Sequence, residues 1–255
     1  MIDNKTSEFL GVTSYRYEND LFSTSIVNYN QFVSEDWHHH EKFHLSSILI
    51  GGNRESRKKG DIQVKPGKIM TYIEGEVHRN RNTVFPSKNL NIEINPKFFN
   101  DEIKLSNLHL DNNCCLSLLK VYHELSLNDV YSDQSVQQIL NPLFYKDVLS
   151  NKPDWINTLK TLLHDRWQEF VSLDELSFEL GLHPVTISKT FSKYAKCTLA
   201  DYMRKLKVEQ AINMLLNSTD SLSEIAYQCG FSDQSHMTRL FKYYVGFSPK
   251  KLRAI

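Results

Sequence analysis

Features typical of secreted, membrane-spanning or zinc-knuckle proteins are scarce in this 255-residue chain. The four cysteines (Cys114, Cys115, Cys197 and Cys229) form no C-x-x-C pair, so neither a disulfide framework nor a zinc knuckle is indicated. No apolar run approaches the roughly 18 residues that a membrane helix needs. The amino terminus lacks a basic patch followed by an apolar stretch, so no secretory signal is visible. We therefore expect a cytoplasmic protein without a membrane partner.

Net charge is also absent, since 30 Lys and Arg balance 30 Asp and Glu. Residues 154–255 carry 13 basic against 11 acidic residues, a net +2, and residues 1–153 carry 17 against 19, a net −2. A DNA-binding domain needs its positive charge on one face rather than a large total. Charge therefore does not decide whether nucleic acid is a partner.

The chain has the composition of a globular protein, with 40% hydrophobic and 24% charged residues, and is long enough for two domains. Three short apolar runs lie at 45–50, 68–73 and 90–94, and Gly51-Gly52 and Pro66-Gly67 interrupt them. Such runs between turn residues are typical of strands. The first hundred residues therefore predict a β-rich domain, a sandwich or a barrel.

From Cys114 the apolar period becomes helical, with one stretch around 116–125 and another around 136–144 that Pro142 should kink or end. These helices either cover their own sheet or pair with a second copy of the chain. The polar Asn151-Lys152-Pro153 is the best domain boundary, and the chain after it reads as all helix.

Two segments of the last hundred residues share one pattern. Ser172 and Glu175 form a capping box, Gly181 ends the helix that follows, and Pro184 opens a second helix. Ser221, Glu224 and Gly230 repeat this pattern 49 residues later, and Ser232 or Asp233 caps another helix. A short helix, a glycine turn and a second helix are typical of a helix-turn-helix unit. The alternative is an ordinary helical bundle.

The second unit resembles the signature of the AraC/XylS family of bacterial regulators. The matching residues are Ile225, Ala226, Gly230, Phe231, Asp233, Gln234, Ser235, His236, Arg239, Phe241, Lys242, Gly246, Ser248, Pro249 and Arg253. The resemblance covers residues 155–255 well and implies a domain that places two recognition helices in successive major grooves. It also implies double-stranded DNA and RNA polymerase as partners, and no enzymatic activity.

By position in the resemblance, the candidate DNA contacts are Val185, Thr186, Ser188, Lys189, Gln234, Ser235, His236 and Arg239. Arg or Lys can donate to guanine O6 and N7, Gln can pair with adenine, and Val can touch a thymine methyl. Ser188 can instead contact only phosphate, and His236 can instead make local hydrogen bonds. Lys189 stands where relatives often have Arg, which makes a bidentate guanine contact less secure.

The amino-terminal half resembles the cupin-like effector domain of such regulators more loosely. A histidine-rich segment at 37–44, the Pro66-Gly67 turn and the Gly75-x-x-His78 motif carry this resemblance. It implies a small-molecule effector, of unknown identity, and tentative contacts from Trp37, His38, His40, His44, Tyr72 and His78.

Metal-dependent cupins show a similar pattern, and His38, His40 and His78 fall at the matching places. The Glu that such cupins place nearby is missing, because His44 or Leu45 stands near its position. We therefore expect no cofactor, and keep a metal at these histidines as the alternative reading, in which the protein is a metal sensor or enzyme. In a third reading the β-domain binds nothing and only dimerises.

The sequence thus predicts an α+β protein of two domains that acts as a ligand-responsive transcription regulator. Residues 1–110 are expected to form a cupin-like β-barrel for the effector. Residues 111–152 would form a helical dimerisation segment, which makes a homodimer the expected assembly. Residues 153–255 would form the all-α tandem helix-turn-helix domain.

Overall fold

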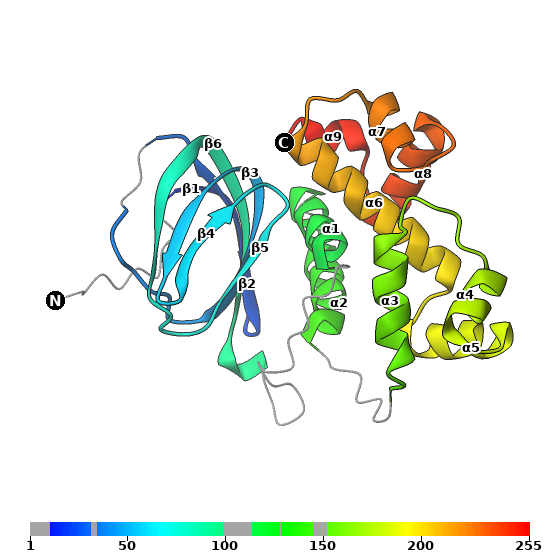
Figure 1. The fold of residues 1–255 in the computed structure, drawn as a ribbon. Helices are drawn as coiled ribbons and strands as arrows, with labels where there is room; N and C mark the ends of the chain where they lie inside the picture. Colours follow the sequence, from blue (N-terminus) through cyan, green and yellow to red (C-terminus); the bar gives the residue numbers. More distant parts are fainter. Residues whose placement is uncertain (1–10, 32–34, 99–113, 128, 145–151) are drawn as a thin grey trace. The chain divides into compact units, whose positions relative to one another are not determined.

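The computed structural model describes residues 11–31, 35–98, 114–127, 129–144 and 152–255. Contacts divide the chain into two units, one of residues 1–146, 216–218 and 251–255 and one of residues 147–215 and 219–250. The first contains an antiparallel sheet followed by helices, and the second is helical (Figure 1), which confirms the predicted α+β class. The predicted boundary at 110/111 lies outside the described residues. Within the described ranges, no helix has the length and apolarity to cross a membrane.

Six antiparallel strands form one bent sheet in the first unit (Figure 1). They are β1 (Val12–Glu18), β2 (Phe22–Tyr29), β3 (Phe43–Arg57), β4 (Gly60–Val64), β5 (Ile69–Tyr72) and β6 (His78–Ile94), followed by the short 3-10 helix η1 (Pro96–Phe98). The strand order is β1-β2-β6-β3-β4, and β5 pairs with the first part of β3. The long strands β3 and β6 therefore hold the sheet together.

Strands β3 and β6 are longer than the apolar runs predicted, because bulges let each strand bend without ending. The β3–β6 register shifts three times between Ile48 and Arg54. Gly51 and Gly52 lie there with φ of 77° and 121°, a region that favours glycine. Asn82 in β6 has a φ of 52°. Each irregularity changes which side chains of the strand face the interior.

The interior of the sheet is partly apolar and partly polar. Ile48, Val64, Met70 and Tyr72 form a buried cluster that Ile62 joins. Buried polar side chains are also numerous on these strands: Ser23, Thr24, Ser25, His44, Ser46, Ser47, Glu55, Ser56, His78, Ser87 and Asn91. Buried polar groups are costly unless they find partners, so a polar interior is a feature that a purely structural core avoids.

Two helices follow the sheet, α1 (Cys114–Leu127) and α2 (Ser132–Phe144). Val136 and Leu140 of α2 are fully buried, as are Val121 and Leu125 of α1. Pro142 lies inside α2, whose last described residue is Phe144, so the proline does not end this helix at the residue before it.

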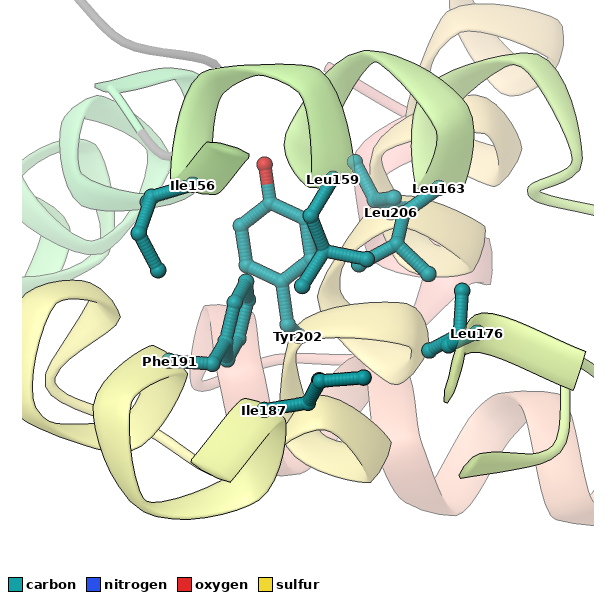
Figure 2. Close-up of a cluster of buried hydrophobic side chains, with 8 residues drawn as sticks. All are labelled: Ile156, Leu159, Leu163, Leu176, Ile187, Phe191, Tyr202 and Leu206. Carbon is teal, nitrogen blue, oxygen red and sulfur yellow. The ribbon is translucent and has the colours of Figure 1, made fainter. Parts of the chain in front are cut away.

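The helical unit contains α3 (Trp155–Asp165), α4 (Leu173–Leu180), α5 (Pro184–Ala195), α6 (Leu199–Asn217), α7 (Leu222–Gln228), α8 (Gln234–Val245) and α9 (Pro249–Arg253). Figure 2 shows a core to which four of them contribute. Its members are Ile156, Leu159 and Leu163 of α3, Leu176 of α4, Ile187 and Phe191 of α5, and Tyr202 and Leu206 of α6. The ring of Phe191 meets that of Tyr202 edge to face at 5.3 Å. This core fixes α5 on the scaffold of α3 and α6.

Candidate DNA-binding surface and ligand pocket

The first helix-turn-helix unit consists of α4 and α5. Ser172 Oγ accepts a hydrogen bond from Glu175 N at 3.2 Å, and Glu175 Oε2 accepts one from Ser172 N at 2.9 Å, which confirms the capping box. Gly181 ends α4 with a φ of 64°, and Pro184 opens α5 after His183, whose Nδ1 accepts from Val185 N at 3.3 Å. Each local signal in the sequence therefore corresponds to a helix end.

Helix α5 has one buried and one exposed face. Ile187 and Phe191 are fully buried, whereas Val185 is 50% exposed and Thr186 and Lys189 are exposed. Three of the four predicted contacts on this helix are therefore open to solvent. The fourth, Ser188, is half-buried and lines a groove between the two helix-turn-helix units.

The second unit consists of α7 and α8. Its capping box joins Ser221 and Glu224 through hydrogen bonds of 3.2 and 2.7 Å. Gly230 has a φ of 68°, and a Cβ there would lie 2.9 Å from Gln168 O. Asp233 caps α8 by accepting from His236 N at 2.7 Å. The turn has one residue more than in the first unit, so the repeat of 49 residues becomes 50 from the second helix onward.

The exposed face of α8 carries Gln234, Ser235 and Arg239, and Met237 and Phe241 are fully buried behind it. With the 50-residue repeat, Arg239 occupies the position that Lys189 occupies on α5. Two predicted contacts already have local partners. Gln234 Oε1 accepts from Ser223 Oγ at 2.7 Å, and His236 Nδ1 lies 3.0 Å from Ser232 Oγ.

Hydrogen bonds hold the second unit on α6 and on the segment that follows α3. Tyr244 of α8 donates to Asp201 of α6 at 2.5 Å, Lys207 of α6 donates to Gly230 O at 3.0 Å, and Gln168 donates to Gln228 O at 3.1 Å. Burial, and then the bond to Asp201, raise the pKa of Tyr244. Desolvation lowers the pKa of Lys207. The second unit is therefore attached to α6, the helix on which the core of Figure 2 also holds α5.

The sheet unit holds a polar pocket with a cavity volume of about 50 Å³. The side chains around it are Tyr29, His38, His40, His44, Ser46, Ile48, Asn53, Glu55, Val64, Tyr72, His78, Asn80, Thr83, Ser87, Asn89 and Asn91. Five of the six predicted effector contacts thus come together. The sixth, Trp37, is half-buried, lies under the guanidinium of Arg79 at 4.8 Å and is not among the described residues that line the pocket.

Histidines crowd one part of this pocket. The ring centroids of His38 and His78 lie 4.4 Å apart, those of His40 and His44 lie 4.1 Å apart, and Tyr72 stacks on His44 at 4.2 Å. Burial is the main cause that lowers the pKa of His40 to about 3. Repulsion from the positive charges of His78, His38 and His39 also lowers it. Burial also lowers the pKa values of His44 and His78. With a pKa of about 3, His40 is neutral at pH 7.

The sequence analysis missed a buried carboxylate in the same pocket. Glu55 is 1% exposed, accepts a hydrogen bond from Tyr72 Oη at 2.5 Å and pairs with the guanidinium of Arg57. Arg57 also pairs with Glu76 at 3.1 Å. Strict alternation from His44 and Ser46 would put Glu55 on the opposite face of β3, and the bulges near Gly51 reverse that parity. The paired glycines Gly51 and Gly52, next to the apolar run 45–50, were the sequence signal that could have indicated these bulges.

Comparison with known proteins assigns the helical unit. A family model described as "Helix-turn-helix domain" matches residues 176–255. The transcriptional activator RhaS of Escherichia fergusonii is 31% identical over 98 residues, which cover 38% of this chain and 35% of the relative. RhaS of Escherichia coli strain HS is 30% identical over 105 residues, 41% of this chain and 38% of the relative. The match thus spans little more than a third of these relatives.

Solved structures also resemble the chain. A crystal structure of apo ToxT from Vibrio cholerae covers 94% of this chain and 99% of its own, with 14% identity and a TM-score of 0.40. An AraC-type regulator from Chromobacterium violaceum covers 39% of this chain and 88% of its own, with 21% identity and a TM-score of 0.38.

The helical unit thus contains two capped helix-turn-helix units in tandem, and residues 176–255 match the helix-turn-helix family model. These matches agree with the resemblance to AraC/XylS regulators that the sequence of this domain carries.

Proposed function

We propose that the whole chain is a sequence-specific transcription regulator whose sheet unit binds a small-molecule effector. One observation carries the DNA-binding part: both recognition helices turn a fully buried apolar face to the core and present Lys189 or Arg239 at equivalent exposed positions. A pair of such helices suits two successive major grooves, about 34–36 Å apart for one DNA turn. The net charge of zero does not contradict this, because DNA binding needs positive charge on one face rather than a large total.

The individual contacts follow from the geometry of each side chain. Arg239, exposed on α8, is placed to donate to a guanine or to phosphate, and Lys189 is placed to do so from α5. Val185 offers a methyl surface for thymine. Gln234 Oε1 already accepts a hydrogen bond from Ser223 Oγ. We therefore propose that Gln234 contacts a base by donating from its amide N–H groups. Thr186, Ser188, Ser235 and His236 complete the proposed surface.

Arg239→Ala is expected to weaken binding to the selected operator by about 1–3 kcal/mol if Arg239 contacts a base. The operator is first identified by selecting genomic fragments that the purified full-length protein binds. Affinity is then measured on the operator and on unrelated DNA. Arg16→Ala in β1 is the matched control, since it removes an exposed arginine outside the helical unit that pairs with Glu18 at 3.1 Å.

A selected motif with two short elements one turn apart, and a loss specific to that motif in Arg239→Ala, support the proposal. An equal loss on every DNA sequence reassigns Arg239 to phosphate. Failure to enrich any fragment, with or without cell extract, contradicts sequence-specific binding.

The effector is proposed to occupy the polar pocket, where His38, His40, His44, Tyr72 and His78 meet. A ligand that favours one state of the protein must bind that state more tightly. Ligand-induced shifts in melting temperature test this, and their absence for every compound class favours the reading in which the sheet unit only dimerises.

Homodimerisation through the helices after the sheet is the proposed assembly, and RNA polymerase is the proposed protein partner. The buried residues of α2, Val136 and Leu140, are already covered within one chain, so a dimer interface would use other faces of α1 and α2. Light scattering at several protein concentrations measures the assembly directly.

A further inference from the structure

We propose that His38, His40 and His78 bind one divalent transition-metal ion inside the pocket of the sheet unit. One ring nitrogen from each lies within 4.8 Å of the others, and all three side chains are buried. Ligand nitrogens around a tetrahedral zinc ion lie about 3.3 Å apart, as Zn–N bonds of about 2.0–2.1 Å dictate. Binding therefore requires the three nitrogens to approach one another from their present separations of up to 4.8 Å. The inference concerns the pocket alone and does not rest on the proposed DNA binding.

The backbone fixes two of these ligands side by side. His38 N donates to His78 O at 2.9 Å, and His78 N donates to His38 O at 2.9 Å. This pair of bonds is an isolated bridge between antiparallel segments and brings the two side chains together. His40, two residues after His38, lies on the same side of an extended segment. Because these ligands are already positioned, metal binding costs little conformational entropy.

Hydrogen bonds also set the tautomers that a metal needs. His38 Nδ1 lies 3.1 Å from Asp36 O, and His78 Nδ1 lies 3.0 Å from Glu76 O. A carbonyl oxygen only accepts, so each Nδ1 carries the proton and each neutral imidazole keeps its lone pair on Nε2. Metal-bound histidines almost always donate their other N–H in this way.

The surroundings suit a metal with an exchangeable position. Three histidines leave a tetrahedral ion one further site for water or a ligand. The carboxylate of Glu55 lines the same pocket, where Tyr72 and Arg57 hold it. Asn and Ser side chains form much of the remaining wall. Imidazole ligands favour zinc, iron, nickel or copper over magnesium or calcium. An oxygen-donor effector could therefore reach the ion directly.

The test titrates Co²⁺ into full-length protein that has been stripped with a chelator, and follows visible absorption and the bound metal per chain. We expect one Co²⁺ per chain, displaced by Zn²⁺. His38→Ala and His78→Ala should each weaken binding by more than about 100-fold, because even second-shell losses cost about 10–100-fold. His39→Ala is the matched control, since this neighbouring histidine is outside the cluster and should retain binding.

Absence of stoichiometric Co²⁺ in the wild-type protein overturns the proposal, and so does undiminished binding in a His38→Ala, His78→Ala double variant. Circular dichroism checks that the variants fold. Should they unfold, imidazole nitrogen NMR of the wild-type chain decides: zinc should shift the Nε2 resonances of His38, His40 and His78. Shifts confined to other histidines contradict the site. DNA selection is measured separately, so failure of one proposal leaves the other intact.

Discussion

The two helix-turn-helix units are built on one plan but satisfy their backbones differently. The second unit caps α8 with Asp233 and ends it at Gly246, which has a φ of 95°. The first unit caps α5 with His183 and ends it at Lys196, which has a φ of 54°. Aspartate is a preferred cap and glycine the preferred left-handed residue. The second unit is therefore encoded locally, whereas the first depends more on the core of Figure 2.

The largest expected effect tests that dependence on the core. Phe191→Ala should destabilise the helical unit by about 3–5 kcal/mol, because the ring is fully buried and leaves a cavity. Phe241→Ala is the equivalent change in the second unit. Hydrogen exchange should show protection lost first in α4 and α5 for Phe191→Ala and in α7 and α8 for Phe241→Ala. Identical exchange patterns would mean that the units do not open separately.

A smaller loss of stability is expected for alanine at the two turn glycines, and it should differ between them. Gly181→Ala should cost about 1 kcal/mol, since its φ is unfavourable for alanine but its surroundings are open. Gly230→Ala should cost about 2–3 kcal/mol, because the new Cβ also meets Gln168 O. Chemical denaturation of the two variants measures the difference. Equal costs would contradict the close approach at Gly230.

The smallest effect exchanges the helix ends. Lys196→Gly should stabilise the helical unit by up to about 1 kcal/mol, because glycine accepts the left-handed conformation without the Cβ penalty. Gly246→Ala is the converse change and should destabilise by a similar amount. Melting temperatures of both variants check the sign, and a destabilised Lys196→Gly would show that the lysine side chain contributes more than its backbone costs.

Local sequence signals were sufficient where structure is local. Ser172, Ser221 and the helix-opening Pro184 identified both units, because caps and turns depend on a few neighbouring residues. The sheet was harder. Its strand lengths and the position of Glu55 depend on bulges in β3, and no period of two reveals where a strand shifts register. The hydrogen bonds of Gln234 and His236 likewise depend on side-chain positions that only the folded units define.

The attachment of both units to α6 has a consequence for the DNA rather than for the protein. Tyr244, Lys207 and Gln168 hold the second unit on α6 and the segment after α3, and the core of Figure 2 holds α5 on α3 and α6, so we expect the distance between the two recognition helices to be restricted. Inserting one base pair between the two operator elements turns one element by about 34° relative to the other. A rigid DNA-binding domain can bind both elements after such an insertion only if the duplex twists or bends, which costs free energy. If the proposed DNA binding is correct, the number of base pairs between the two operator elements is therefore itself part of the recognised sequence.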